Sequence, residues 1–136
     1  MKNLEQLRAM HALEFWRPVQ GQPPQTRGVN KGDVVSKLPG LVVSNGLLQT
    51  AAFAKSKGGG HQELLLAVFR FLSHPDRALL PTPTAARPGE PEIERYIRLL
   101  TDGPDATSLR LQAATAEALA YMGYLKRFAP KPALHV

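Results

Sequence analysis

Two histidine–carboxylate pairs are the residues of this sequence best suited to chemistry. His61 precedes Glu63 by two positions, and His74 precedes Asp76 by the same spacing. Imidazole and carboxylate groups bind divalent metals, but neither pair has a third ligand at metal-binding spacing in the sequence. We therefore expect His61 to begin a helix, His74 to lie in a loop, and the chain to hold no metal and no cofactor. A small metal-dependent nuclease remains an alternative, and it requires His61 or His74.

Potential nucleophiles do not stand in catalytic motifs. Ser36, Ser44 and Ser56 lack the G-x-S-x-G setting of an activated serine, and neither H-E-x-x-H nor G-x-x-x-x-G-K-[ST] occurs. The 136 residues contain no cysteine, which excludes a disulfide framework, a thiolate zinc site and a cysteine nucleophile. We predict that the chain is not an enzyme.

A glycine-rich segment offers a contact for phosphate. Residues 57–61 read KGGGH and come directly before an apolar helical pattern. Free N–H groups at a helix N-terminus, beside Lys55 and Lys57, suit a phosphate group. The same glycines also suit a plain turn between two helices, and both interpretations stay open.

Positive charge is concentrated in the first half of the chain. The 17 Lys and Arg against 11 Asp and Glu give a formal charge of +6 and a pI near 10.0. Between positions 17 and 57 a single acid, Asp33, stands among the basic residues Arg17, Arg27, Lys31, Lys37, Lys55 and Lys57. This excess favours an acidic partner, with nucleic acid first. The alternative is that these are solvated side chains that only keep the protein soluble.

Aromatic residues indicate how a nucleic acid would be held. Those that fall within helical apolar patterns are Trp16, Phe53, Phe69, Phe71, Tyr121, Tyr124 and Phe128. Because most of them are expected in the core, we expect contact with the nucleic-acid backbone, independent of sequence and sensitive to salt. If about five cations meet phosphates, the slope of log affinity against log salt should be about −3.5.

Apolar residues recur at helical spacing, and no stretch alternates as a strand would. Helices are expected over 3–20, 30–37, 39–57 and 61–72, from 91 to about 102, and from an N-cap at Asp105 to about 128. The predicted fold class is all-α: a single domain over 1–136, built as a compact bundle of about five or six helices.

Within this bundle the 39–57 helix is apolar in most directions, so we expect it to be central and mostly buried. It should follow a break at 38–40 and form an antiparallel hairpin with the 61–72 helix. Four prolines make 73–90 a long loop. Glu94 and Arg98 are expected to form an exposed i,i+4 pair.

No segment suits a membrane or a secretion signal. The longest apolar run, residues 64–69, is far shorter than the roughly 20 residues of a membrane span. Glu5, Arg8 and Glu14 interrupt any signal-peptide pattern at the start of the chain. We expect a cytoplasmic protein.

Two blocks of the sequence resemble the small subunit of the type III-B CRISPR effector, the fifth protein of the Cmr complex. Residues 37–57 read KLPGLVVSNGLLQTAAFAKSK, and residues 115–129 read TAEALAYMGYLKRFA. The N-terminal helix fits as well, whereas residues 22–29 and the proline-rich loop are not covered.

This resemblance implies an all-helical, non-catalytic subunit that acts in antiviral defence. Family members stack in a few copies as an inner filament and line the channel of guide RNA paired with target RNA, while the backbone subunit cleaves the target. The implied partners are the other Cmr subunits, neighbouring copies of this chain, guide RNA and target RNA. The alternative function is a helical adaptor that joins proteins without touching RNA.

The matched blocks also suggest which cations bind RNA. They contribute Lys37, Lys55, Lys57, Lys126 and Arg127. Arg17 and Lys31 are added on charge placement alone.

Overall fold

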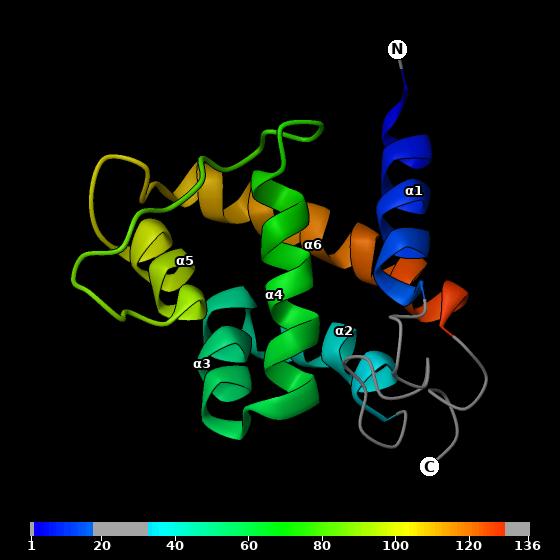
Figure 1. Cartoon of the computed structure of the whole chain (residues 1–136), viewed down its shortest axis with the longest axis horizontal. Coiled ribbons are helices and arrows are strands. Elements are labelled where there is room, and N and C mark those ends of the chain that lie inside the picture. Colours follow the sequence, from blue (N-terminus) through cyan, green and yellow to red (C-terminus); the bar gives the residue numbers. More distant parts are fainter. Residues whose placement is uncertain (1, 18–32, 130–136) are drawn as a thin grey trace.

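The structure is a computed structural model that describes residues 2–17 and 33–129. All regular structure within these ranges is helical, which confirms the all-α bundle (Figure 1). The helices are α1 (Leu4–Trp16), α2 (Asp33–Asn45), α3 (Leu47–Lys57), α4 (Gly59–Ser73), α5 (Glu92–Thr101) and α6 (Ser108–Phe128). The predicted continuation of the first helix to position 20, the predicted helix start at position 30, and Arg27 lie outside the described residues.

Helix α4 is the central element of the bundle. It contacts α2, α3, α5 and α6, and Figure 1 shows it in the middle, with α3 and α5 on one side and α1 on the other. Its sequence GGHQELLLAVFRFLS buries apolar side chains in most directions, Leu65 and Phe69 completely. The prediction that residues 39–57 form the central, mostly buried helix is therefore wrong. Val43 is 72% exposed and Phe53 40% exposed, because α2 and α3 each bury only one face.

Two aromatic stacks attach α4 to its neighbours. Phe71 lies parallel to Tyr121 of α6 with ring centroids 4.2 Å apart, and Phe69 lies parallel to Tyr96 of α5 at 4.9 Å. The Tyr96 hydroxyl also meets the Ser73 hydroxyl at 2.8 Å, which satisfies a polar group beside the core. These side chains hold α5 and α6 against different faces of the same helix.

The chain breaks its helix at Gly46, not at Pro39 as predicted. Pro39 lies inside α2, where it removes one backbone hydrogen bond but keeps a helical φ. Gly46 has a φ of +89°, which no helix can continue through and which glycine adopts most easily. Its N–H donates to the Val42 carbonyl at 2.8 Å to close α2, and its own carbonyl accepts from the Thr50 N–H at 3.1 Å to open α3.

A turn at Gly58 joins α3 to α4 as the predicted antiparallel hairpin (Figure 1). Gly58 and Gly59 both have positive φ, at +67° and +52°. The Gly58 N–H donates to the Ala54 carbonyl at 2.8 Å, and α4 begins at Gly59, two residues before the predicted start at His61.

The proline-rich segment between α4 and α5 contains no helix, as predicted, but it is tied down at several points. Leu80 is buried, and the Ala86 N–H donates to Glu90 Oε1 at 2.7 Å. Arg98 binds both Glu90 oxygens, at 3.0 and 3.2 Å, and also donates to the Thr84 carbonyl. The expected Glu94–Arg98 pair is therefore wrong, because the buried Glu90 carboxylate takes the Arg98 guanidinium instead.

Helix α6 forms the long support behind the other helices. Its N-cap is Thr107 and not the predicted Asp105, since the Thr107 hydroxyl accepts the Arg110 N–H at 3.1 Å. It contacts α1, α2 and α4, and the Trp16 indole N–H of α1 donates to the Leu125 carbonyl at 2.8 Å. Among the described residues, no helix combines the length and apolar character needed to cross a bilayer.

Candidate functional site

The structure brings two of the predicted RNA-binding cations together around His61. Lys37 extends from α2 and Lys57 from the last turn of α3, and both are exposed. Burial lowers the pKa of His61, and the positive charges of Lys57 and Lys37 lower it further. Both ammonium groups therefore act on the same imidazole, at the end of the bundle where α3 turns into α4. We call Lys37, Lys57 and His61 the basic patch.

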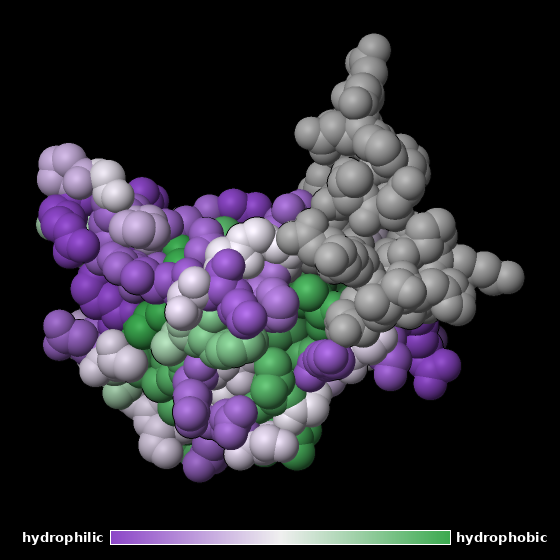
Figure 2. All heavy atoms as spheres, turned by 90° about the horizontal axis from the view of Figure 1, so that it is seen from below, coloured by the Kyte–Doolittle hydropathy of each residue, from purple (hydrophilic) through white to green (hydrophobic). Residues whose placement is uncertain are grey.

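An exposed aromatic ring borders the basic patch. Phe53 lies edge-on to His61 with ring centroids 5.5 Å apart, and Lys57 Nζ is 5.8 Å from the Phe53 ring centroid. The expectation that aromatic residues lie in the core holds for Trp16 and Tyr121 but not for Phe53. Seen from below, the face that includes the α3–α4 turn mixes hydrophilic and apolar side chains (Figure 2).

The other predicted cations do not join this patch. Lys55 Nζ pairs with Glu94 Oε1 of α5 at 3.1 Å, and Arg17 Nη2 pairs with Glu14 Oε2 at 2.9 Å. Both of these charges are thereby matched by a carboxylate. Lys31 lies outside the described residues.

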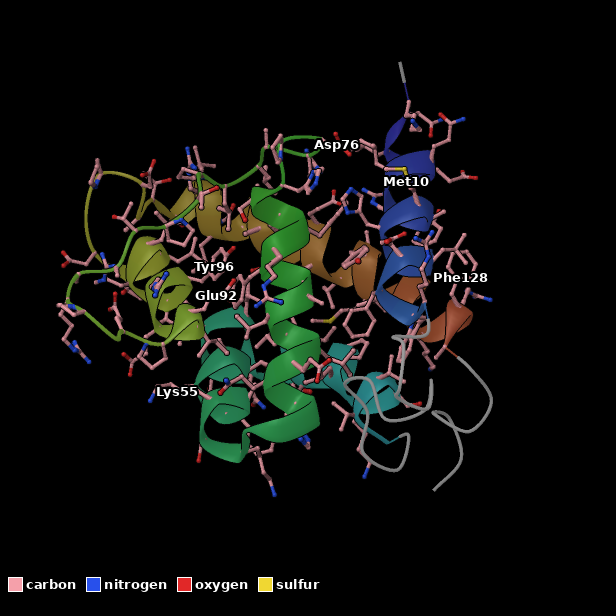
Figure 3. The ribbon with its side chains drawn as sticks, in the orientation of Figure 1. Met10, Lys55, Asp76, Glu92, Tyr96 and Phe128 are labelled. Carbon is pink, nitrogen blue, oxygen red and sulfur yellow. The ribbon has the colours of Figure 1, made fainter. Side chains whose placement is uncertain are left out.

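Lys126 and Arg127 form a separate basic end in the last turn of α6, and both are exposed. Figure 3 shows the neighbouring Phe128 at the opposite side of the molecule from Lys55. The predicted cations are thus divided between at least two surfaces, a division that helix periodicity alone does not reveal.

A groove with mostly apolar lining runs between the α2–α3 junction and α6. Its volume is about 570 Å³, and residues 45–49 line one side. The other side consists of Leu111, Gln112, Thr115, Ala116 and Leu119.

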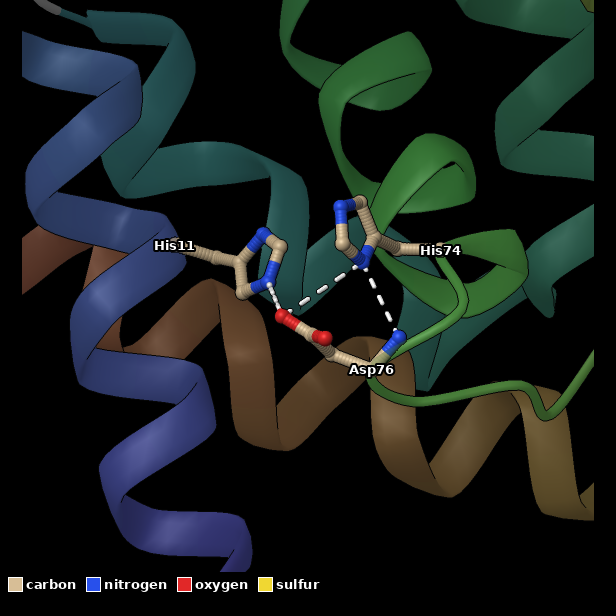
Figure 4. A group of neighbouring side chains, drawn as sticks. All are labelled: His11, His74 and Asp76. Carbon is tan, nitrogen blue, oxygen red and sulfur yellow. Dashed lines mark hydrogen bonds and ion pairs between the residues drawn. The ribbon is translucent and has the colours of Figure 1, made fainter. Parts of the chain in front are cut away.

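A second polar cluster joins α1 to the turn after α4. His11 Nε2 lies 3.3 Å from Asp76 Oδ2, and His74 Nδ1 lies 3.6 Å from the same oxygen (Figure 4). The sequence pattern pairs His74 with Asp76 but misses His11, which is distant in sequence and carries no local signal. Only the packing of α1 beside this turn brings the third side chain to the pair.

A buried ion pair holds this cluster in place. Glu117 of α6 is 4% exposed and accepts from Arg8 Nε at 2.6 Å, Arg8 Nη2 at 2.8 Å and Arg77 Nη2 at 2.9 Å. Burial alone would raise the pKa of Glu117, but the hydrogen bonds and charges of the two arginines hold it below its usual value. Arg8 shares α1 with His11, and Arg77 follows Asp76, so one carboxylate fixes both parts of the cluster.

The fold and surface define an all-helical protein with cations dispersed over more than one face and an apolar groove between the α2–α3 junction and α6. The family model described as CRISPR-associated protein (Cas_Cmr5) matches residues 4–131. The chain therefore belongs to the Cas_Cmr5 family, the small subunits of the type III-B Cmr complex. Family membership implies that it associates with other subunits of that complex. No curated protein and no solved structure matches the chain.

Proposed function

We propose that this chain is the non-catalytic small subunit of a type III-B CRISPR RNA-guided effector, that it forms the inner filament, and that it contacts the guide and target RNA backbone. The basic patch is the observation that supports RNA contact most directly. Lys37 and Lys57 lie close enough to one imidazole for both charges to lower its pKa. Two exposed cations that act on the same imidazole present the kind of surface that a phosphate backbone occupies.

Backbone contact also fits the division of labour in an RNA-guided complex. Base pairing between guide and target carries the sequence information, so a bound protein needs only positive charge and a complementary shape. Lys126 and Arg127 would extend the contact at the far end of α6, on the same strand of RNA or on that bound by a neighbouring copy.

The test is reconstitution of a Cmr-type effector purified without its small subunit, with guide RNA present, followed by size exclusion. The wild-type chain is expected to join and to increase RNA retention. The double variant Lys37→Glu with Lys57→Glu should lose that increase. Lys55→Glu is avoided because it would place two carboxylates together at Glu94.

A matched control separates the patch from net charge. Lys2→Glu with Ser108→Glu and Ala113→Glu makes the same change of charge at three exposed positions outside the patch, and RNA retention should stay at the wild-type level. Equal losses in the patch variant and in this control would mean that net charge alone explains the effect and would refute the patch. Failure of the wild-type chain to join at low salt would refute the subunit role itself.

Salt dependence gives an independent number. Each phosphate contact on single-stranded nucleic acid contributes about 0.7 to the slope of log affinity against log salt. Replacing Lys37 and Lys57 by Gln should therefore reduce the magnitude of the slope by about 1.4. An unchanged slope would mean that these two cations meet no phosphate.

The apolar groove supports the second candidate function, a helical adaptor that binds a neighbouring protein subunit without touching RNA. Ala116 is exposed and lines the groove, whereas Ala113 is exposed on the same helix but does not line it. If the groove holds a protein partner, Ala116→Arg should prevent joining and Ala113→Arg should not. Loss of joining with Ala116→Arg, together with normal RNA retention in the Lys37 and Lys57 variants, would favour the adaptor.

A further inference from the structure

The cluster of His11, His74 and Asp76 has the composition and spacing of a metal site. Together the three side chains offer two imidazole nitrogens and one carboxylate oxygen, all within 4.8 Å of one another. We propose that these residues bind a divalent transition metal of the Zn²⁺ class. This inference does not depend on RNA contact or on the proposed function.

Two of the distances between the ligand atoms, those from each imidazole to the Asp76 carboxylate, suit a tetrahedral ion. When Zn–N and Zn–O bonds are about 2.0–2.1 Å long, neighbouring ligand atoms of a tetrahedron lie about 3.3–3.4 Å apart. The distance from His11 Nε2 to Asp76 Oδ2 is 3.3 Å, and that from His74 Nδ1 to Asp76 Oδ2 is 3.6 Å. The second is too long for a good hydrogen bond, whereas an ion between the atoms needs only a small adjustment.

A backbone hydrogen bond identifies His74 Nδ1 as an acceptor, which is the role that a metal-binding nitrogen needs. The Asp76 backbone N–H donates to His74 Nδ1 at 3.0 Å, so this nitrogen carries a lone pair and not a proton. Metals bind the neutral imidazole through such a lone pair. The nitrogen lone pair also faces Asp76 Oδ2 across 3.6 Å, an unfavourable meeting of two acceptors (Figure 4). A cation between them would form one bond to each atom. The His74 ring would rotate so that Nδ1 points to the ion, and the Asp76 N–H, at an exposed residue, would then donate to water.

The backbone holds the cluster before any ion arrives. The turn that carries His74 and Asp76 is closed by the Arg77 and Ala78 N–H groups, which donate to the His74 carbonyl at 2.9 and 2.6 Å. The Glu117 ion pair then fixes both this turn, through Arg77, and α1, which carries His11. Binding therefore orders few additional groups, which favours affinity.

Access and local charge also suit an ion with an open fourth position. His11 is 17% exposed, His74 43% and Asp76 42%, so solvent reaches one side of the cluster. His11 and His74 border a cavity of about 380 Å³, large enough for a water ligand.

The cations that line this cavity are each matched by an acid. Arg17 pairs with Glu14 at 2.9 Å, and Arg70 pairs with Glu92 at 2.5 Å. Glu63 adds a further negative charge to the cavity wall. The charges of the cavity wall therefore do not oppose a divalent cation.

The experiment titrates the full-length chain, freed of any polyhistidine tag, with Zn²⁺ by calorimetry and with Co²⁺ by visible absorption. We expect one ion per chain and the visible bands of four-coordinate Co²⁺. His11→Gln and Asp76→Asn should each weaken Zn²⁺ binding by more than about tenfold. Losing a residue that only supports a metal ligand already lowers metal affinity by about tenfold or more, and these two residues are proposed as ligands themselves. Mg²⁺, which prefers oxygen ligands in an octahedron, should not compete.

His61→Gln is the matched control, because His61 is partly buried and has two lysines, not a carboxylate, acting on it. It should bind Zn²⁺ like the wild type. Circular dichroism verifies that each variant is folded, and the rise in melting temperature with Zn²⁺ should vanish in His11→Gln and persist in His61→Gln. Absence of one-to-one binding at millimolar Zn²⁺, or equal weakening in the His11 and His61 variants, would overturn the proposal.

Discussion

Arg8 and Glu117 join the first helix to the last through two parallel hydrogen bonds, of 2.6 and 2.8 Å. The guanidinium uses both Nε and Nη2, which fixes its direction as well as its distance. Because Arg77 adds a third bond to the same carboxylate, α1, α6 and the turn after α4 meet at one buried group.

Removing the charge of this carboxylate should destabilise the whole bundle. Glu117→Gln keeps the shape but leaves two arginines, 22% and 19% exposed, without a counter-charge. We expect the free energy of unfolding to fall by about 3 kcal/mol in urea titrations. Glu5→Gln, at an exposed acid in the first turn of α1, should change it by less than about 0.5 kcal/mol. Similar results for both variants would show that the buried pair contributes little.

Gly46→Ala should destabilise the protein by backbone strain alone. A Cβ at this position meets no atom within 4 Å, but the φ of +89° is unfavourable for alanine. The expected loss is about 1–3 kcal/mol. Gly123→Ala provides the contrast, since that glycine lies within α6, has open space, and should gain up to about 1 kcal/mol. Chemical denaturation of both variants measures the difference, and equal effects would contradict the strain argument.

Acid should loosen the proline-rich segment through Glu90. The hydrogen bonds from Arg98 and the Ala86 N–H lower the pKa of Glu90 to about 2. Since the folded-state pKa lies below the unfolded value, this carboxylate stabilises the fold above about pH 4.5, and the contribution is lost as pH falls toward 2. Thermal melts between pH 6 and 2 should show a smaller pH dependence for Glu90→Gln than for wild type. An identical pH dependence would contradict this role.

His61 reports the electrostatics of the basic patch directly. Lys57→Gln should raise the pKa of His61 toward 6.5, because one of the charges that lower it is removed. Burial, the larger cause, remains, so the recovery should be partial. Titration of the His61 ring by NMR measures the shift. Lys2→Gln should leave the pKa of His61 unchanged, and an equal shift there would indicate a general charge effect.

The helical nature of the elements and their approximate residue ranges were predictable, because the spacing of apolar residues is a local signal. The central position of α4 was not, since both 39–57 and 61–72 are strongly apolar and only tertiary packing selects between them. The end of α2 is a second feature that the sequence pattern alone did not predict. Pro39 is the stronger sequence signal, but it retains a helical φ, whereas the positive φ of Gly46 ends α2.

The candidate site was predictable only in part. The sequence indicates which residues are basic, and the structure divides them: Lys37 and Lys57 act on one imidazole, while Lys55 is taken by Glu94. The His74–Asp76 pair was visible as a local pattern. His11 was not, because its approach depends on the packing of α1, which the buried Glu117 ion pair helps to fix.

A single residue, Gly46, joins α3 to α2, so a backbone rotation at Gly46 would move α3 as one rigid unit. The 11 residues of α3 span about 16 Å at about 1.5 Å per residue, so a turn of about 20° at its base would carry Lys57 about 5 Å sideways. That distance exceeds the rise of about 3.4 Å of helix axis per phosphate along one strand of a nucleic-acid duplex. Burial of Leu47, Ala51 and Ala54 holds α3 at one angle to the rest of the bundle. The contact of these apolar side chains with the core thus sets the position of the Lys57 charge on the surface.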